Sequence, residues 1–399
     1  MENNKTPSIR FKGFTDPWEQ RKVKEICSIS TGKSNTQDRV DEGIYPFYVR
    51  SPIVERSNRY LFDEEAVLTV GDGVGTGKVF HYVNGKYDLH QRVYRMFDFS
   101  SEINAKYFYY YFSDHFYNRV MSMTAKTSVD SVRYEMIADM DILLPKLNEQ
   151  IAISNCFDNL DNLITLHQRK YNKLLNVKKS MLEKMFPKNE SNIPEIRFKG
   201  FTDPWEQRKL GDQMFIKSRI GWQALTKKEY LETGDYYLIT GTDIDEDKHI
   251  VDFNCCYYVS KERYEMDDKI QVYEGDIIVT KDGTIGKVAM VTGLDKPATL
   301  NSHLFVLRDL SGKLYNRFLL QVLVSHIFGD FVESTKTGST LTGLPQKTFV
   351  EFRFLMPEMD EQMKIAQYLD NLDNLITLHQ RELEKLQNIK KSMLEKMFV

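Results

Sequence analysis

A glycine-rich stretch at residues 69–79 (TVGDGVGTGKV) has residue types found in phosphate-binding loops. Such a loop needs a Gly-Lys pair, a second glycine five positions before the first residue of that pair, and Ser or Thr after the lysine. Gly77 and Lys78 supply the pair, but the other two positions are Asp72 and Val79. The spacing therefore predicts a tight turn between two strands and argues against a nucleotide site.

Two further stretches resemble parts of catalytic motifs, and both are incomplete. Thr-Asp-Pro-Trp, at 15–18 and again at 202–205, lacks the second proline of a DNA amino-methyltransferase motif. Glu246, Asp247 and Lys248 form a carboxylate-x-lysine triplet, but the chain has no Pro-Asp dipeptide to complete the common nuclease arrangement. We therefore expect a chain that is not itself an enzyme.

Exact repeats divide the chain into two halves. The repeated stretches are IRFKGFTDPWEQRK at 9–22 and 196–209, DNLDNLITLHQR at 158–169 and 370–381, and KKSMLEKMF at 178–186 and 390–398. The segments between them, roughly 23–145 and 210–357, are nearly unrelated to each other. In the first repeat the aromatic residues are expected to pack each domain against the helices; they are Phe11, Phe14 and Trp18, with their copies Phe198, Phe201 and Trp205.

The repeats that end each half predict two long helices. Apolar residues recur three and four positions apart, as in a coiled-coil seam. The seam residues are Leu160, Ile164, Leu174 and Met181 in the first helix, and Leu372, Ile376, Leu386 and Met393 in the second. Leu163 and Leu375 lie beside the seams and widen the apolar stripe, while Lys178 and Lys390 are interpreted as register-setting or snorkelling residues. Two near-identical helices of this kind are expected to pack on each other as an antiparallel pair.

The variable segments have the patterns of mixed domains. Residues 64–83 and 275–291 alternate β-branched residues around Asp-Gly turns, which predicts a hairpin in each. The predicted fold is α+β, with two globular α/β domains and two long helices packed as an antiparallel coiled coil with pseudo-twofold symmetry. The predicted boundaries are 1–145 and 190–357 for the globular domains, and 146–189 and 358–399 for the helices.

Composition narrows the class of protein. The 399 residues carry 54 Lys and Arg against 57 Asp and Glu, a net charge of −3. No apolar run reaches the length of a bilayer-spanning helix, and the polar start MENNKTPSIR does not resemble a signal peptide, so we expect a cytoplasmic protein. The chain has four cysteines, Cys27, Cys156, Cys255 and Cys256. Their spacing fits neither a metal site nor a disulfide framework, so they are expected to be small buried residues.

The order of domains and helices resembles the specificity subunits of type I restriction-modification systems. The local marks of this resemblance are LPKLNEQIAISNCFDNLDNLI at 144–164 and MPEMDEQMKIAQYLDNLDNLI at 356–376. In that family each variable segment is a target recognition domain that reads one half of a bipartite DNA site. The resemblance implies that this chain selects the site at which adenines are methylated or cleavage is triggered, and that it performs neither reaction.

The resemblance also implies partners and cofactors. The expected partners are double-stranded DNA, two copies of a methyltransferase subunit docked on the helices, and restriction subunits in the larger complex, with no membrane. No cofactor is expected on this chain, and S-adenosylmethionine, ATP and Mg are expected on the partner subunits.

Base-reading residues are expected on loops of each domain, around the turns at 72–77 and 281–284. Arg and Lys suit guanine, Asn and Gln suit adenine, and Ser and Thr adapt to either. The candidates in the first domain are Arg50, Arg56, Asn58, Arg59, Lys126, Thr127, Ser128 and Arg133. Those in the second are Lys217, Arg219, Trp222, Gln223, Lys227, Lys281, Thr284, Lys336, Thr337, Ser339 and Thr340.

The charge of the two variable segments sets a condition on DNA binding. Lys and Arg number 14 against 17 Asp and Glu in residues 23–145, and 17 against 21 in residues 210–357. Because phosphate neutralisation supplies much of a DNA binder's affinity, the acidic groups are expected away from the DNA, with affinity shared by partner subunits.

An alternative function from another class stays open at this point. Two globular domains on a coiled coil could form a scaffold or adaptor without DNA specificity. The contrast between fixed helices and variable domains favours recognition, because duplicated scaffolds usually diverge throughout.

Overall fold

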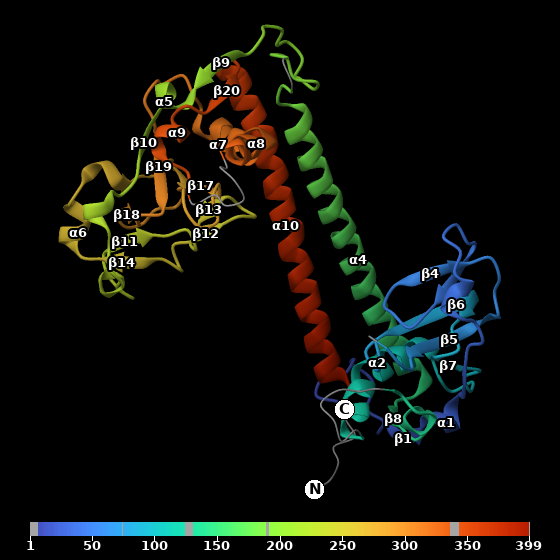
Figure 1. Cartoon of the computed structure of the whole chain (residues 1–399). Coiled ribbons are helices and arrows are strands. Elements are labelled where there is room, and N and C mark those ends of the chain that lie inside the picture. Colours follow the sequence, from blue (N-terminus) through green and yellow to red (C-terminus); the bar gives the residue numbers. More distant parts are fainter. Residues whose placement is uncertain (1–6, 74, 124–130, 189–190, 336–342, 399) are drawn as a thin grey trace. The chain divides into compact units, whose positions relative to one another are not determined.

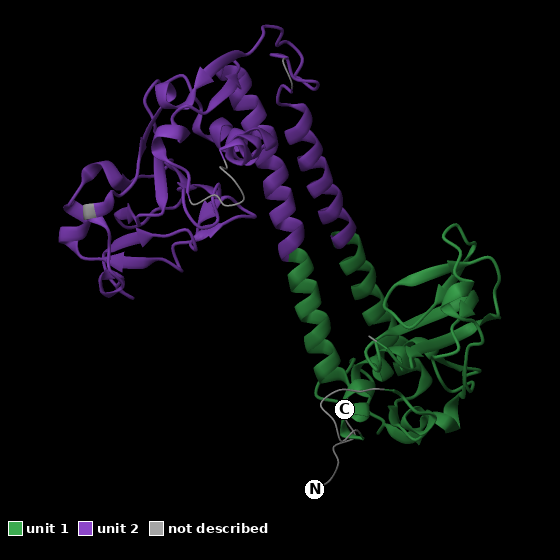
Figure 2. Cartoon of the chain, viewed as in Figure 1, with its two compact units in different colours: residues 1–167, 382–399 green, residues 168–381 purple. Residues whose placement is uncertain are grey.

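A computed structural model of the chain describes residues 7–73, 75–123, 131–188, 191–335 and 343–398. Two compact units emerge: residues 1–167 together with 382–399, and residues 168–381 (Figure 2). Each long helix contributes one part to each unit. The domain boundaries written from the sequence stay a prediction, because the units divide both helices.

The first unit is built on a six-stranded sheet with the order β2-β7-β5-β6-β3-β4. Its elements are β1 (Glu19–Lys22), α1 (Val23–Ile26), β2 (Ser28–Thr31), η1 (Thr36–Asp38), β3 (Tyr45–Tyr48), β4 (Val54–Ser57), β5 (Phe62–Val70), β6 (Phe80–Leu89), β7 (Val93–Phe97), α2 (Ala105–Ser122), α3 (Tyr134–Ala138) and β8 (Asp141–Leu144). The predicted hairpin is confirmed, because β5 and β6 pair antiparallel from Phe62–Tyr87 to Thr69–Phe80.

Helix α2 covers one face of this sheet. Asn104 caps the helix by accepting the Tyr107 backbone N–H at 2.9 Å. One helix face then presents Phe108, Phe112 and Phe116, which are fully buried together with Val67 of β5. Because neighbouring strand residues point to opposite faces, the residues on either side of Val67 form a second cluster on the far face of the sheet.

The second unit follows a related plan with more strands. Its elements are β9 (Glu206–Lys209), α5 (Leu210–Gln213), β10 (Met214–Lys217), η2 (Gly221–Gln223), η3 (Lys227–Glu229), β11 (Tyr236–Ile239), β12 (Ile244–Asp245), β13 (Ile250–Val251), β14 (Tyr257–Val259), α6 (Lys261–Glu265), η4 (Asp268–Ile270), β15 (Gln271–Val272), β16 (Ile277–Thr280), β17 (Val288–Met290), β18 (Ala298–Leu300), β19 (Leu304–Asp309), α7 (Asn316–Val324), α8 (His326–Ser334), α9 (Gln346–Phe349) and β20 (Arg353–Met356). One sheet has the order β10-β19-β16-β17-β13-β12 and another β14-β11-β18-β15. The second predicted hairpin is confirmed by the antiparallel pairing of β16 with β17.

The two long helices are α4 (Leu147–Lys184) and α10 (Met359–Met397), shown in green and red in Figure 1. In the first unit Phe157 stacks on Phe398 at 5.6 Å between ring centroids, and Lys390 Nζ lies 2.5 Å from Asp161 Oδ1. Residue numbers rise along one helix while they fall along the other, so the helices run antiparallel. In the second unit Lys178 Nζ makes the equivalent contact with Asp373 at 2.6 Å. The seam lysines therefore pair with an aspartate across the helices.

An identical junction joins each domain to a helix. Strand β1 pairs with β8 and β9 pairs with β20, with the repeated EQRK sequence as one strand of each sheet. Trp18 and Trp205 are each 2% exposed, in cores that include residues of the long helices. The prediction that these tryptophans pack the domain against the helices is confirmed.

A Glu-Gln pair stands at the start of both α4 and α10. The hydrogen bonds of the two glutamines explain why the sequence repeats this pair. Gln150 accepts the Asn104 N–H at 2.9 Å and donates to the Pro145 carbonyl at 2.9 Å. Gln362 makes the same bonds to the Tyr315 N–H and the Pro357 carbonyl, at 2.8 and 2.9 Å. Each buried glutamine thereby joins the end of a strand, the approach to a domain helix and the start of a long helix.

The described ranges also bear on the expectations about membrane-spanning helices, cysteines and fold class. None of the helices there has the length and hydropathy needed to cross a bilayer. The cysteines are less uniform than expected, because Cys256 is buried whereas Cys255 is exposed. The α+β prediction is confirmed by the two sheet-containing domains and the two long helices.

Candidate nucleic-acid interface

The glycine-rich turn of the first domain is fixed by its neighbours. A Cβ atom at Gly71 would lie 2.6 Å from the Arg92 carbonyl oxygen, so the backbones approach too closely for any side chain. Gly73 has a φ of 88°, which suits glycine. On the other side Val132 donates to the Gly71 carbonyl at 2.7 Å. The turn is thus held between the start of β7 and the segment at 131–132.

Asp72 at this turn lies between two exposed arginines. Its oxygens are 3.5 Å from Arg50 Nη1 and 3.8 Å from Arg92 Nε. The arginine side chains are 48% and 66% exposed, against 26% for Asp72. A carboxylate with two cationic neighbours can orient both guanidinium groups while their remaining donors face solvent.

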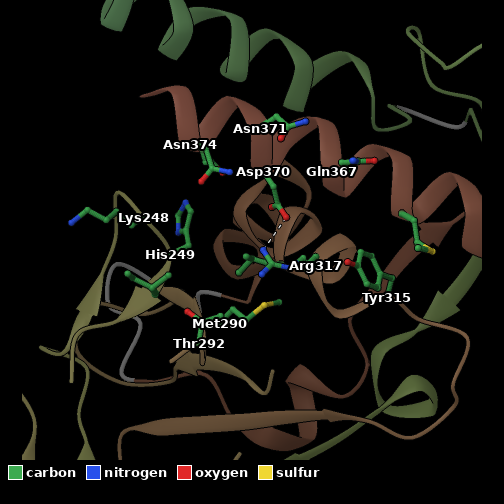
Figure 3. Close-up of a pocket in the computed structure, with 14 residues that line it drawn as sticks. Lys248, His249, Met290, Thr292, Tyr315, Arg317, Gln367, Asp370, Asn371 and Asn374 are labelled. Carbon is green, nitrogen blue, oxygen red and sulfur yellow. Dashed lines mark hydrogen bonds and ion pairs between the residues drawn. The ribbon is translucent and has the colours of Figure 1, made fainter. Parts of the chain in front are cut away.

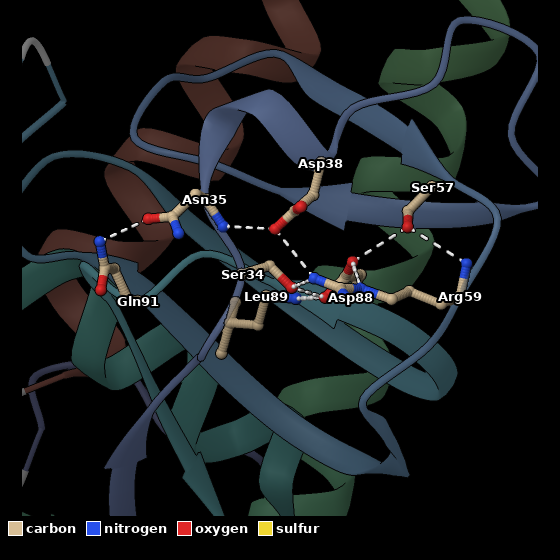
Figure 4. A network of polar contacts seen from close by, with 8 residues as sticks. All are labelled: Ser34, Asn35, Asp38, Ser57, Arg59, Asp88, Leu89 and Gln91. Carbon is tan, nitrogen blue, oxygen red and sulfur yellow. Dashed lines mark hydrogen bonds and ion pairs between the residues drawn. The ribbon is translucent and has the colours of Figure 1, made fainter.

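The first domain also contains a polar network with Asp88 at its centre (Figure 4). Asp88 is fully buried and accepts from the hydroxyls of Ser34 and Ser57 at 2.5 and 2.9 Å. Arg59 donates to Ser34 Oγ and Asp38 at 3.0 and 2.8 Å, and its Nε lies 3.5 Å from Asp88. The buried carboxylate therefore anchors a loop that holds the 55% exposed Arg59 side chain in place.

The charges of the turn and of the network act together on His90. Burial lowers the pKa of His90, and the nearby charge of Arg50 lowers it further, followed by a smaller lowering by Arg92. Asp72 and Asp38 act in the opposite direction. The buried imidazole thus interacts with charged groups from several loops. Cationic side chains lie together at this place although the variable segment is net acidic.

The structure brings together only some of the residues predicted for the first domain. Arg50 and Arg59 lie at the cluster, whereas exposed Arg56 donates to the Ile44 carbonyl at 3.4 Å and Arg133 precedes α3 as its N-cap. Asn58 is exposed on the segment that follows β4. The remaining predicted residues lie outside the described ranges; they are Lys126, Thr127 and Ser128.

Three residues of the same cluster escaped the sequence prediction. They are Asn35, Gln91 and Arg92, with Gln91 Nε2 donating to Asn35 Oδ1 at 2.6 Å (Figure 4). The signal that could have identified Gln91 and Arg92 is a run of polar and basic residues directly after His90. Asn and Gln are the types that suit adenine, and Arg suits guanine.

The second domain repeats the turn with other residues. Asp282 Oδ2 lies 3.2 Å from His303 Nδ1, and the histidine is 59% exposed. Lys281 donates to Ser218 Oγ at 3.1 Å. Thr284 is exposed in this turn, and its carbonyl accepts from the Thr280 hydroxyl. Lys281 and Thr284 therefore lie at the turn, as predicted.

Arg219 and Gln223 correct the prediction. Their side chains are 1% and 2% exposed. Arg219 donates to the Leu300 carbonyl at 2.8 Å and to Thr299 Oγ1 at 3.1 Å, and burial lowers its pKa to about 10. Gln223 accepts the Ile220 N–H at 3.0 Å and donates to Asp267 at 2.8 Å. Because these groups are occupied inside the fold, both residues stabilise the domain and neither faces a ligand.

The other residues predicted for the second domain are distributed as follows. Lys217 ends β10 and is half-buried, whereas Lys227 is exposed at the start of η3. The side chain of Trp222 lies outside the described part of the chain, as do the residues Lys336, Thr337, Ser339 and Thr340.

The helix residues predicted to bind partners divide into two groups. The seam positions are buried or half-buried; they are Leu160, Ile164, Leu174, Met181, Leu372, Ile376, Leu386 and Met393. The seam faces the other long helix within the chain, and the prediction that these residues bind a partner subunit stays a prediction. Leu163 and Leu375 are each 44% exposed, and the sequence prediction missed Leu166 and Leu378, which are 45% and 52% exposed.

A cavity of about 700 Å³ lies between the second domain and α10 (Figure 3). Arg317 Nη1 donates to Asp370 at 2.9 Å along its lining, which also includes His249, Asn371 and Asn374. At the equivalent place of the first unit Lys106 donates to Asp158 at 2.8 Å beside a cavity of about 280 Å³. The first aspartate of each DNLDNLI repeat thus binds a helix of its own domain.

Comparisons with known proteins agree with this arrangement. Type I restriction enzyme MjaVIII specificity subunit of Methanocaldococcus jannaschii is 22% identical over 95% of this chain and 91% of its own length. Type I restriction enzyme EcoDI specificity subunit of Escherichia coli is 20% identical over 96% and 88%. The crystal structure of the S subunit of a type I restriction-modification system from M. genitalium has the same fold, with a TM-score of 0.65, 16% identity and 99% of each chain covered. The family described as type I restriction modification DNA specificity domain matches residues 15–176 and 202–388, and this chain belongs to that family.

Proposed function

We propose that this chain is the DNA-recognition subunit of a type I restriction-modification complex, in which each domain reads one half of an asymmetric bipartite site. The observation that carries the proposal is a repeated framework that holds two different domains. The junction strands, the buried Glu-Gln pair and the Lys-Asp pair between helices recur in both units. The loops that this framework presents differ in sequence, as two different half-sites require.

The exposed leucines support a proposal for the partners. Leu163 and Leu166 on α4 have equivalents in Leu375 and Leu378 on α10, and all four are large apolar side chains left in solvent. Apolar groups repeated at equivalent positions suit two copies of one partner, because each copy then meets the same residues. We assign these surfaces to two methyltransferase subunits, with restriction subunits joining the larger complex.

The charge of the two variable segments supports the proposal that other subunits carry the remaining functions. Both variable segments are net acidic, so the cluster around Asp72 and Asp88 supplies only a small basic surface. DNA affinity of the isolated chain should therefore be low, with partner subunits closing round the duplex. In this proposal the complex is cytoplasmic, this chain is non-catalytic, and S-adenosylmethionine, ATP and Mg bind to the partners.

The test is co-expression of the chain with candidate methyltransferase subunits in a host without other adenine methylation, followed by methylome sequencing. The expected result is one gapped motif whose two halves differ. Absence of methylation when the complex assembles, or methylation without a sequence motif, would favour the scaffold alternative. Tight DNA binding by the purified chain alone at physiological salt would contradict the proposed sharing of affinity.

A further inference from the structure

The two domains hold one loop in the same way although their sequences are nearly unrelated. In the first, the His90 N–H donates to the Tyr48 carbonyl at 3.0 Å and His90 Nδ1 accepts the Arg92 N–H at 3.0 Å. In the second, the Asn301 N–H donates to the Ile239 carbonyl at 2.9 Å and Asn301 Oδ1 accepts the His303 N–H at 2.9 Å. His90 and Asn301 are 4% and 5% exposed. In each domain a buried side chain thus accepts the backbone N–H of the residue two positions later, and that later residue carries an exposed, basic side chain.

The Asp-Gly turns are held equivalently. Val132 donates to the carbonyl of Gly71, the residue before Asp72, at 2.7 Å. Leu344 donates to the carbonyl of Lys281, the residue before Asp282, also at 2.7 Å. Each turn then places its aspartate beside the exposed side chain of the neighbouring loop. The pairs are Asp72 with Arg92 and Asp282 with His303, at 3.8 and 3.2 Å.

These pairs combine a fixed backbone with a variable side chain. Arg92 and His303 are 66% and 59% exposed, so their partner aspartates leave most of each side chain open to solvent. The surrounding hydrogen bonds are independent of which basic residue the loop carries. Such a position can change its base preference without a change in fold, and the two domains of this chain carry different residues there.

We propose that Arg92 and His303 are base-specificity residues at equivalent positions of the two domains, with Asp72 and Asp282 as positioning residues. This inference rests on the proposed DNA-recognition function. Arg92 has two donor groups that match guanine O6 and N7, whereas a histidine ring offers a single hydrogen bond to a base edge. The base opposite Arg92 is therefore a guanine, and the base opposite His303 is read less strictly.

The experiment uses the complex assembled with its methyltransferase subunits. Methylation rates are measured on a DNA library in which each base of one half-site is randomised in turn. Arg92→Ala is expected to reduce discrimination at one position of one half-site by roughly 5- to 150-fold, the range of one good bidentate contact. His303→Ala should act only on the other half-site, with a smaller reduction.

Matched controls are Lys24→Ala and Lys261→Ala. Both lysines are exposed and paired with a carboxylate of their own domain, Asp139 and Glu265, and neither pair includes a residue of the turns. Neither variant should change a base preference. If Arg92→Ala lowers the rate equally on all sequences, the side chain contacts phosphate and the inference is overturned. An unchanged preference overturns it as well.

Asp72→Asn separates positioning from a merely structural role. Loss of the carboxylate should weaken discrimination at the same base position as Arg92→Ala, and the double variant should be no worse than Arg92→Ala alone. Additive effects, or effects at another position, would contradict the positioning role. If the wild-type complex yields no gapped motif, the proposed function itself fails; a wild-type motif with unaltered variants defeats only this inference.

Discussion

Arg10 and Arg197 each bind a buried glutamate at the start of a long helix. Arg10 donates to both oxygens of Glu149 at 2.6 and 2.7 Å, and Arg197 donates to Glu361 at 2.8 and 2.7 Å. The glutamate side chains are 1% and 0% exposed, and the arginines are each 12% exposed. Because each junction depends on a bidentate pair shielded from water, loss of one partner leaves a buried charge.

Glu149→Ala should therefore destabilise the first unit by about 3–5 kcal/mol, the cost of breaking a buried ion pair. Glu361→Ala should have a similar effect on the second unit. Chemical denaturation of each variant, with hydrogen exchange to locate the affected unit, measures this. Asp16→Ala is the matched control, because the Asp16–Lys146 pair is exposed and screened by solvent and should contribute far less to stability. Equal losses for Glu149→Ala and Asp16→Ala would contradict the role of burial.

His249 is expected to make the second unit sensitive to acid. Burial lowers the pKa of this imidazole from its ordinary value of 6.5, and the charge of Lys178 lowers it further, while Asp373 and Asp245 oppose the shift. Its Nδ1 lies 3.3 Å from the Val288 carbonyl oxygen, and its φ of 53° is in the left-handed region. The folded state therefore favours the neutral ring, whereas the unfolded chain binds a proton near the ordinary pKa.

The contribution of His249 to stability is present above about pH 6.5 and is lost as the pH falls toward its lower folded-state pKa. His249→Asn should reduce the loss of stability between pH 7 and pH 5, since asparagine tolerates the left-handed backbone and does not titrate there. Thermal unfolding of both proteins across this range measures the difference. The same comparison above pH 7 is the control, where the two curves should run parallel. An unchanged slope below pH 6.5 would exclude His249 as a source of acid sensitivity.

At the scale of elements, each long helix ends inside a domain core. Phe398, near the end of α10, is 6% exposed and packs on Phe157, Tyr107 and Tyr111. Phe186, just after α4, is 1% exposed and packs on Trp205. The repeated Met-Phe sequence therefore anchors each helix by its last turn to a domain.

Phe398→Ala should destabilise the first unit by about 3–5 kcal/mol, as expected for truncation of a buried phenylalanine. Phe186→Ala should do the same in the second unit. Hydrogen exchange resolved by segment checks that each loss is confined to its own unit. Leu166→Ala is the control, because this side chain on the same pair of helices is 45% exposed and should cost much less. Loss spread evenly over both units would argue against local anchoring.

Sequence periodicity predicted these elements well because it reflects burial along one helix or strand. The seam of α4 and α10 and the two hairpins follow directly from spacings of three, four and two. The sequence could not show that Arg219 is buried, because its acceptors lie some 80 residues away, at Thr299 and Leu300. Arg92 was missed for the same reason: its significance depends on Asp72, which only the fold brings near. The residue types of exposed loops can be read from the sequence, but tertiary contacts determine where their side chains lie.

At the scale of the whole molecule, the repeated junctions and long helices form a framework that is distinct from the variable domains. The β1–β8 and β9–β20 sheets share the sequence EQRK and the same four-residue antiparallel register. The buried Arg-Glu pairs and Gln150 or Gln362 recur at both junctions. Since each domain contacts the framework through these shared groups, we expect the framework to accept either domain.

A chimera tests this equivalence. Residues 23–144 are replaced by residues 210–356, which keeps the EQRK strand and joins it to the β20 strand with which it pairs in the second unit. In complex with the methyltransferase subunits, the chimera should methylate a motif in which both halves equal the second half of the wild-type motif, because the strand pairing and the framework contacts are retained. Methylome sequencing reads the two halves directly. The reciprocal replacement is the control and should duplicate the first half, and a chimera that folds and assembles but keeps an asymmetric motif would show that the framework itself reads DNA.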